Sequence, residues 1–346
     1  MKIRPHKVGS VVARLDLEQE LEFSRMVDAR TGQVLLVRAL EEKRVYDVME
    51  LVSGRMAHVG RGDVLVGALG RRDALRGYVG RVPEKLKAGD TIHLLNLGGV
   101  LGDAIGENQD VGHPLRVEVI GQVMRNGKGV NVADAALPEP PADSRIPPLV
   151  VVSGSCMNSG KTVAACEVIT RLTARGYTCG GVKFTGVAAL RDTLSMADHG
   201  AVATLSFVDC GLPSTAGVDD VGPVARTLMR SIEDQAGVDL DVVVAEMGDG
   251  IIGCYGVETI LADPAFRGLI RAHVYCANDL VAAWGGVEWL KARDLPVDVI
   301  AGPATDNQVG MRYIQDTMGV QAANARTDSE RFADLVEEAA FARASS

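Results

Sequence analysis

Hydrophobic and polar positions follow one pattern up to about residue 135 and another after residue 149. The first part has short apolar runs separated by turn signals such as Arg61-Gly62-Asp63 and Asn126-Gly127, a pattern typical of strands. The runs cover residues 9–15, 33–40, 64–69, 77–82, 91–97 and 115–123. They predict a β-rich N-terminal domain, a small barrel or sandwich, over residues 1–135.

Two segments of this domain differ from the strand pattern. We expect a short helix at residues 45–51. The glycine-rich stretch 98–103 is expected to be a flexible loop in which Gly98 and Gly99 mark either a β-bulge or a place where a ligand approaches the backbone.

Five prolines within residues 136–148 predict a semi-rigid linker, because proline continues neither a helix nor a central strand. Residues 149–346 then alternate between strand and helix patterns. Strands are expected at 149–152, 179–184, 242–245, 272–276, 297–301 and 320–323, and helices at 163–172, 224–236, 280–292 and 308–318. A capping box from Thr327 to Glu330 predicts a last helix. This alternation predicts an α/β fold, a mostly parallel doubly wound sheet covered on both faces.

Composition narrows the class of protein. The 346 residues are 47% hydrophobic and 23% charged, without an apolar run long enough to span a membrane, so we expect a globular cytoplasmic protein. The net charge of −9 lies almost wholly after residue 145, which gives no basic patch for nucleic acid. None of the six cysteines forms a C-x-x-C pair, so a zinc site is not expected.

One stretch combines a buried strand, a glycine-rich turn and a helix. The turn reads Gly154-Ser155-Cys156-Met157-Asn158-Ser159-Gly160-Lys161-Thr162, and the helix continues from Val163. In such a turn, backbone N–H groups and the positive end of the helix point at one small volume, which suits a polyphosphate. We expect residues 154–163 to bind a nucleotide, with Lys161 reaching the β- and γ-phosphates and Thr162 ligating Mg²⁺.

The turn departs from the common phosphate-loop pattern, because Ser155 stands at the first glycine position and Gly154 lies one residue further out. The longer form resembles the loop of dethiobiotin synthetase and its relatives, the cobyrinic-acid-type synthetases and the molybdopterin-guanine-dinucleotide accessory proteins. The resemblance covers about residues 149–323 and nothing before them. It implies an ATP-dependent enzyme with Mg²⁺, a small-molecule substrate and a homodimer.

Two more segments take part in this resemblance, each at the end of an expected strand. Lys183-Phe184-Thr185-Gly186 resembles the family's Lys-Pro-Val-Ala-Ser-Gly, which implies that Lys183 stabilises the transferred negative charge. Glu246-Met247-Gly248-Asp249-Gly250 resembles a Glu-Gly-Ala-Gly-Gly segment, which implies that Glu246 ligates Mg²⁺ or positions water. Substrate contacts are then expected from Thr185, Gly186, Gly248 and Asp249. Met247 and Asp249 depart from the family pattern, so the substrate is expected to differ from the family's.

For three residues the sequence allows two roles each. Asp192 either completes the metal shell or is an exposed polar residue of a loop. Asn307 either reads the purine edge or caps the helix that follows it. Cys156 lies near a helix N-terminus, which lowers a thiol pKa, and is either a nucleophile or an inert part of the loop.

These residues predict a Mg²⁺-dependent P-loop enzyme that uses ATP to phosphorylate or activate a carboxylate or carbamate for ligation, with Lys161, Lys183 and Glu246 as its catalytic residues. One alternative is a nucleotide-gated accessory protein of GTPase type that loads a metal or cofactor. Another is an acyl-CoA-dependent N-acyltransferase, because the layout of the loops also resembles a family whose phosphate loop contains a cysteine. In that alternative the loop cradles the phosphates of coenzyme A. ATP versus GTP stays open.

Overall fold

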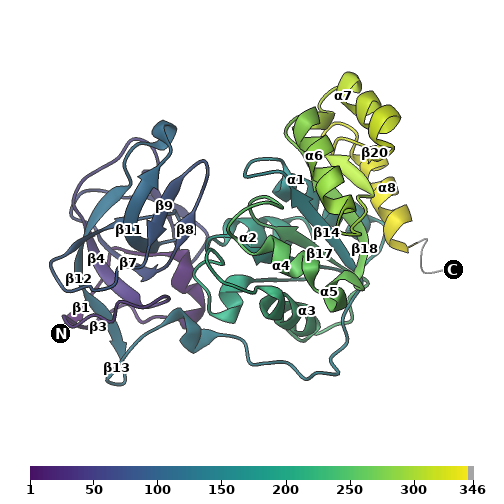
Figure 1. Ribbon diagram of the computed structural model, residues 1–346. Coiled ribbons are helices and arrows are strands. Elements are labelled where there is room, and N and C mark those ends of the chain that lie inside the picture. Colours follow the sequence, from purple (N-terminus) through teal and green to yellow (C-terminus); the bar gives the residue numbers. More distant parts are fainter. Residues whose placement is uncertain (342–346) are drawn as a thin grey trace. The chain divides into compact units, whose positions relative to one another are not determined.

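The computed structural model describes residues 1–341 and divides the chain into two compact units (Figure 1). The β-rich unit consists of Met1–Pro138 together with two later segments, Val187–Arg191 and Phe207–Gly217. The α/β unit contains the rest, from Glu139 on. Pro138 lies in the proline-rich stretch. The two later segments were not anticipated, because nothing in their composition sets them apart from the α/β pattern around them.

The β-rich unit is built from short strands and single-turn helices. The strands are β1 (Lys2–Ile3), β2 (Lys7–Val8), β3 (Leu21–Ser24), β4 (Val34–Ala39), β5 (Val48–Glu50), β6 (Met56–His58), β7 (Val64–Leu69), β8 (Arg72–Asp73), β9 (Tyr78–Arg81), β10 (Thr91–Leu94), β11 (Val100–Glu107), β12 (Leu115–Arg125) and β13 (Lys128–Gly129). The 3₁₀ helices are η1 (Ser10–Leu15), η2 (Gln109–Val111), η3 (Val132–Ala135) and η4 (Phe207–Cys210).

Five of these strands close into a barrel. Strand β4 pairs with β7 and β12, β10 pairs with β12 and β11, and β11 pairs with β7. Only the β7–β11 pairing in this ring is parallel. Closure leaves no free edge in the ring. Alternate residues of β4 and β12 point into one hydrophobic core, which includes Leu35, Val37, Ala39, Leu115, Val117 and Val119.

Three expectations for this unit were wrong. Residues 10–15 form η1 instead of a strand, because Val11, Val12 and Leu15 are all buried, a spacing that a strand does not provide. The expected helix at 45–51 contains strand β5, which pairs antiparallel with β6. The stretch 98–103 runs directly into β11, whose first residues pair with β7 and β10.

The α/β unit contains a seven-stranded sheet. Its strands are β14 (Leu149–Gly154), β15 (Cys179–Thr185), β16 (Ala203–Ser206), β17 (Val242–Met247), β18 (Ile270–Cys276), β19 (Val299–Ala301) and β20 (Gln321–Ala322). They lie in the order β16-β15-β17-β14-β18-β19-β20, and all neighbours are parallel. The carboxyl ends of all seven strands therefore meet at one edge of the sheet.

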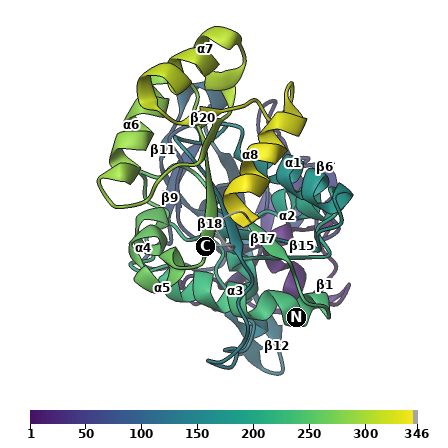
Figure 2. The same ribbon diagram turned by 90° about the vertical axis from the view of Figure 1, so that its right-hand side faces the viewer.

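Helices cover both faces of this sheet (Figure 2). They are α1 (Lys161–Ala174), α2 (Arg191–Asp198), α3 (Gly222–Ala236), α4 (Val257–Ala262), α5 (Pro264–Arg267), α6 (Leu280–Lys291), α7 (Gln308–Tyr313) and α8 (Ser329–Phe341), with the 3₁₀ helix η5 (Pro303–Thr305) and the π-helix η6 (Ile314–Met318). Helices α1 and α8 pack together on one face over the central strands, with Ile169, Leu172, Phe332 and Val336 in the core. The predicted doubly wound fold is confirmed, and α2, α4, α5 and β16 are additions to it.

The start of helix α8 differs from the expected capping box. Glu330 was expected to reach back to the backbone at Thr327. Its carboxylate instead pairs with the guanidinium groups of Arg171 and Arg175. Asp334 and Glu337 also pair with Arg175, and hydrogen bonds to these three carboxylates raise the pKa of Arg175. The ion pairs join α8 to α1. No helix in the described part of the chain is long and apolar enough to cross a membrane.

Candidate functional site

The glycine-rich turn lies at the carboxyl edge of the parallel sheet, between β14 and α1. Ser155 N donates to Cys276 O over 2.9 Å and Ile251 N donates to Gly154 O over 2.9 Å, so the end of β18 and the loop after β17 are each joined to the turn. Gly160 precedes α1 with a φ of 92°, in the left-handed region that favours glycine. The turn thus joins a buried strand to a helix N-terminus directly behind it, the arrangement that suits a phosphate.

Two glycines from other loops let the backbone close on this turn. A Cβ on Gly302 would lie 2.4 Å from Ser159 O, and a Cβ on Gly250 would lie 2.4 Å from Ser155 O. Both distances are shorter than real Cβ contacts, so neither position accepts a side chain without a backbone shift. Gly250 belongs to the acidic loop that the sequence singled out, and this contact places that loop against the turn.

Lys161 is folded back over the turn. Its Nζ donates to Cys156 O over 2.7 Å and to Ser159 Oγ over 3.4 Å, and the residue is only 5% exposed. The Nζ of Lys161 is therefore held by neutral oxygens of the turn itself. It can exchange these oxygens for those of a phosphate.

Lys183 and Glu246 occupy neighbouring strands directly opposite each other. The register pairs Lys183 of β15 with Glu246 of β17, and Glu246 with Val152 of β14, so the two side chains lie on the same face of the sheet. Both residues are buried, at 8% and 3% exposure. The sequence placed both at strand ends, and the structure brings them to one edge.

Asp192 was expected as a metal ligand or as an exposed loop residue. It lies in helix α2, and its buried carboxylate accepts a hydrogen bond from Lys183 Nζ. The exposed-loop interpretation is therefore wrong. The ion pair fixes the direction of the Lys183 side chain, and a role of Asp192 as a metal ligand stays a prediction.

Glu246 Oε2 is buried and has no hydrogen-bond partner. An unpaired buried carboxylate oxygen is costly, so its presence points to a ligand that binds there. Burial raises the pKa of the Cys276 thiol to about 12. The charge of Lys161 lowers this pKa, and the charge of Glu246 raises it. Both charges therefore lie near enough to the end of β18 to influence the same thiol.

The Glu246 carboxylate at the end of β17 and the hydroxyl of Thr162, the second residue of α1, are oxygen donors of the kind that suits Mg²⁺, which binds one or two protein oxygens and keeps several waters. Among residues 1–341 no cluster of three or more His, Cys, Asp and Glu side chains forms a site that could hold a metal by itself. The residues present thus fit a metal bound together with a phosphate, and they do not fit a closed protein cage.

The expected substrate residues hold the acidic loop in place. Thr185 Oγ1 donates to Gly248 O over 3.0 Å, and a Cβ on Gly248 would lie 2.1 Å from Thr185 O. Asp249 adopts a φ of 67° and Gly186 one of 135°, so both loops turn sharply just after their strands. These four residues lie together, at the same edge as Lys183 and Glu246.

Asn307 caps a helix. Its Oδ1 accepts from Val309 N over 3.0 Å and from Gly310 N over 3.1 Å at the start of α7, which confirms the capping interpretation. The amide oxygen is therefore engaged at the start of α7.

Sequence reasoning missed two residues of this edge. Asn278 Nδ2 donates to Cys156 Sγ over 2.9 Å, and the Cys156 thiol donates to Met157 O over 3.3 Å. The rule that ligand residues follow parallel strands points to Asn278, two residues after β18. The second is His273, whose Nε2 lies 2.7 Å from Ser153 Oγ, directly before the loop. Complete burial lowers the pKa of His273 to about 4.

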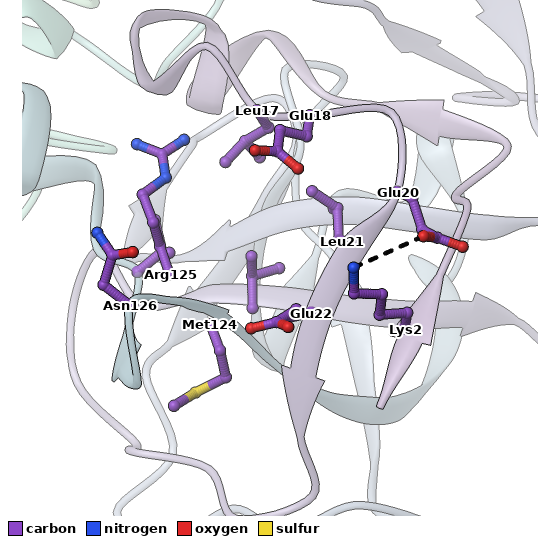
Figure 3. Close-up of a pocket in the computed structure, with 11 residues that line it drawn as sticks. Lys2, Leu17, Glu18, Glu20, Leu21, Glu22, Met124, Arg125 and Asn126 are labelled. Atoms are coloured by element: carbon purple, nitrogen blue, oxygen red, sulfur yellow. Dashed lines mark ion pairs between the residues drawn. The ribbon is translucent and has the colours of Figure 1, made fainter.

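The β-rich unit contains a hollow that is lined by other residues than those described above (Figure 3). Its walls carry Glu18, Glu20 and Glu22, and Lys2 pairs with Glu20 at 3.9 Å. Arg125 donates to Leu15 O over 2.7 Å. No residue that the sequence predicted for the site lines this hollow.

No protein-family model matches this sequence, and no curated protein matches it. Among solved structures, it is similar to the signal recognition particle 54 kDa protein from Aeropyrum pernix in complex with GDP (18% identity, TM-score 0.37, 60% of this chain and 48% of that chain). It is also similar to a DUF1611-family protein from Anabaena variabilis (13%, 0.39, 57% and 62%) and to chloroplast FtsY from Physcomitrella patens (12%, 0.37, 59% and 70%).

The matched region spans about half of the first of these proteins and less than two thirds of the second. At these identities, and with TM-scores below 0.4, the likenesses assign neither a ligand nor an activity to this chain. The P-loop architecture rests on the strand, turn and helix described above. Membership of the dethiobiotin-synthetase-like group stays a prediction.

Proposed function

We propose that this protein is a Mg²⁺-dependent enzyme that transfers the γ-phosphoryl group of a nucleoside triphosphate to a small-molecule oxyanion, a carboxylate or carbamate, and so activates it for ligation. The observation that carries the proposal is the unpartnered, buried Glu246 Oε2 at the same sheet edge as the buried ammonium of Lys161. A phosphate with its Mg²⁺ supplies the opposite charge that each of these groups needs.

Binding begins at the turn. The backbone N–H groups of residues 156–160 and the N-terminus of α1 would hold the β-phosphate. Lys161 would give up Cys156 O and Ser159 Oγ, its partners at 2.7 and 3.4 Å, and donate to phosphate oxygens instead. Thr162 and Glu246 would hold Mg²⁺, which supplies positive charge to the phosphates.

Lys183 would act on the group being transferred. Its ammonium is directed by Asp192, and it lies opposite Glu246 in the sheet register. In the transfer step an oxygen of the acceptor forms a bond to the γ-phosphorus while the bond to the leaving diphosphate breaks. Negative charge spreads over the three equatorial oxygens, and a fixed cation stabilises it.

The acceptor would be bound by the loops after β15 and β17. Thr185, Gly186, Gly248 and Asp249 belong to these loops, and the Thr185–Gly248 hydrogen bond joins them. The proposed enzyme is a homodimer and is located in the cytoplasm. The alternative is a GTP-dependent accessory protein. It would bind its nucleotide at the same loop and transfer no phosphoryl group to a small-molecule acceptor.

The test is Lys161→Ala, with Lys291→Ala as the matched control on the exposed end of α6. We expect Lys161→Ala to lose binding of Mg²⁺ with ATP or GTP by at least about 100-fold, as measured by calorimetry, because a charge-assisted contact to two phosphates is removed. Lys291→Ala should bind like the wild type. Unchanged nucleotide binding by a folded Lys161→Ala variant would refute the proposal.

A further inference from the structure

The chain passes twice from the α/β unit into the β-rich unit, each time after a strand of the parallel sheet. Val187–Arg191 follows β15 and Phe207–Gly217 follows β16, and these two strands are neighbours. Inside the β-rich unit the two segments pair with each other. Val187 and Ser214 form an antiparallel bridge, and Ala188 N donates to Pro213 O over 3.0 Å.

The first segment is held firmly within the β-rich unit. Asn96 Nδ2 donates to Ala188 O over 2.7 Å, and a Cβ on Gly98 would lie 1.9 Å from the same oxygen. For Gly98 and Gly99 the sequence left open a β-bulge or the approach of a ligand to the backbone. The group that approaches is this chain's own Ala188.

Glu50 makes the most specific contact with this segment. Its carboxylate is fully buried and accepts hydrogen bonds from Leu190 N over 2.6 Å, from Arg191 N over 2.8 Å and from Ser10 Oγ. A buried carboxylate is tolerated only when donors surround it. Here two of the donors are consecutive backbone amides at the start of helix α2, which begins at Arg191.

Both ends of the segment lead to the proposed site. Thr185 and Gly186 precede it, and Asp192, the partner of Lys183, is the next residue after Arg191. Consecutive Cα atoms are 3.8 Å apart, so a carboxylate that fixes the amide of Arg191 also restricts where Asp192 can lie.

We infer that Glu50 is a positioning residue of the phosphate site: by fixing the amides of Leu190 and Arg191 it sets the start of α2, and with it the carboxylate that directs Lys183. The inference rests on the proposed function, in which Lys183 acts on the γ-phosphoryl group. It gives the β-rich unit a role that its own sequence pattern did not reveal.

The experiment is Glu50→Gln, with Glu20→Gln as the matched control at an exposed position of the same unit. Glutamine has the same size, but one carboxylate oxygen becomes an NH₂ group that cannot accept from a backbone amide. Two properties are measured: the ratio of the dissociation constants of the Mg²⁺ di- and triphosphate of the purine that binds, and the rate of tryptic cleavage after Arg191.

We expect Glu50→Gln to lower the preference for the triphosphate about tenfold, to leave diphosphate binding unchanged, and to speed cleavage after Arg191 about tenfold. Glu20→Gln should match the wild type in both. If Glu50→Gln is folded and changes neither property, the inference is refuted. If that variant does not fold, Ser10→Ala takes its place, since it removes only the hydroxyl donor to Glu50 and should change both properties in the same direction by a smaller factor. No change in a folded Ser10→Ala would equally refute the inference.

This failure can be told apart from failure of the proposed function. If Lys161→Ala retains nucleotide binding, the proposed function falls, and the claim that Glu50 acts on the phosphate site falls with it. If Lys161→Ala loses binding and Lys183→Ala loses the triphosphate preference while Glu50→Gln keeps it, only the role of Glu50 is wrong.

Discussion

His273 should make the α/β unit sensitive to acid. Its imidazole is completely buried next to Ser153, and burial lowers its pKa from 6.5 to about 4. Above pH 6.5 the ring is neutral in the folded and in the unfolded chain, so it does not change the free energy of unfolding with pH. Below pH 6.5 the unfolded chain takes up a proton that the folded chain does not bind until about pH 4, so stability falls through this window.

The size of the effect follows from the shift. One pKa unit corresponds to about 1.4 kcal/mol, so the lost stability is about 2 kcal/mol at pH 5 and approaches about 3 kcal/mol at pH 4. The perturbation is His273→Gln, which keeps a polar group for Ser153 and cannot be protonated. The matched control is His199→Gln, at an exposed position in the same unit.

The assay is urea unfolding at pH 8 and pH 5, followed by tryptophan fluorescence. The only two tryptophans, Trp284 and Trp289, both lie in α6, so the signal reports on the α/β unit. The titration of carboxylates changes the free energy of unfolding of every variant by the same amount. The difference between variants therefore reports the contribution of His273 alone. The wild type and His199→Gln should lose about 2 kcal/mol more than His273→Gln between these pH values. Equal losses in all three would show that this reasoning is wrong.

Two further predictions concern packing in α6 and the metal ligand. Gly286→Ala should destabilise the α/β unit by about 1–3 kcal/mol in the same urea assay, because its Cβ would lie 2.1 Å from the Tyr275 ring. Its neighbour Gly285 faces open space, so Gly285→Ala should leave stability unchanged or raise it by up to about 1 kcal/mol; equal effects at both positions would contradict this. Glu246→Gln should weaken nucleotide binding in Mg²⁺ about tenfold and leave binding in EDTA unchanged in calorimetry, because it removes one charge from the proposed metal site; an equal loss in both conditions would exclude a metal role.

The parallel sheet could be predicted because its strands are buried on both faces. Runs such as Val150 to Val152 and Val242 to Ala245 are apolar without interruption, and amphipathic helices lie between them. The phosphate loop could be predicted for the same local reason, since strand, turn and helix are continuous in sequence. The sequence placed Lys183 and Glu246 at strand ends, and the register that sets them opposite each other came only with the structure.

Other features depend on contacts between residues far apart in sequence. Glu50 and Arg191 are separated by 141 residues, and nothing near Glu50 indicates that its donors are backbone amides of a later segment. The ion pair between Lys183 and Asp192 needed helix α2, which the sequence pattern did not reveal. His273 stands in an apolar strand, where its neighbours in sequence say nothing about its bond to Ser153.

The central claim is tested most directly by calorimetric titration of the wild-type protein with ATP, GTP and acetyl-CoA, each in Mg²⁺ and in EDTA. The account predicts that one of the purine triphosphates binds and that its binding weakens at least tenfold in EDTA. Binding of acetyl-CoA alone, with no response to either triphosphate, would contradict it.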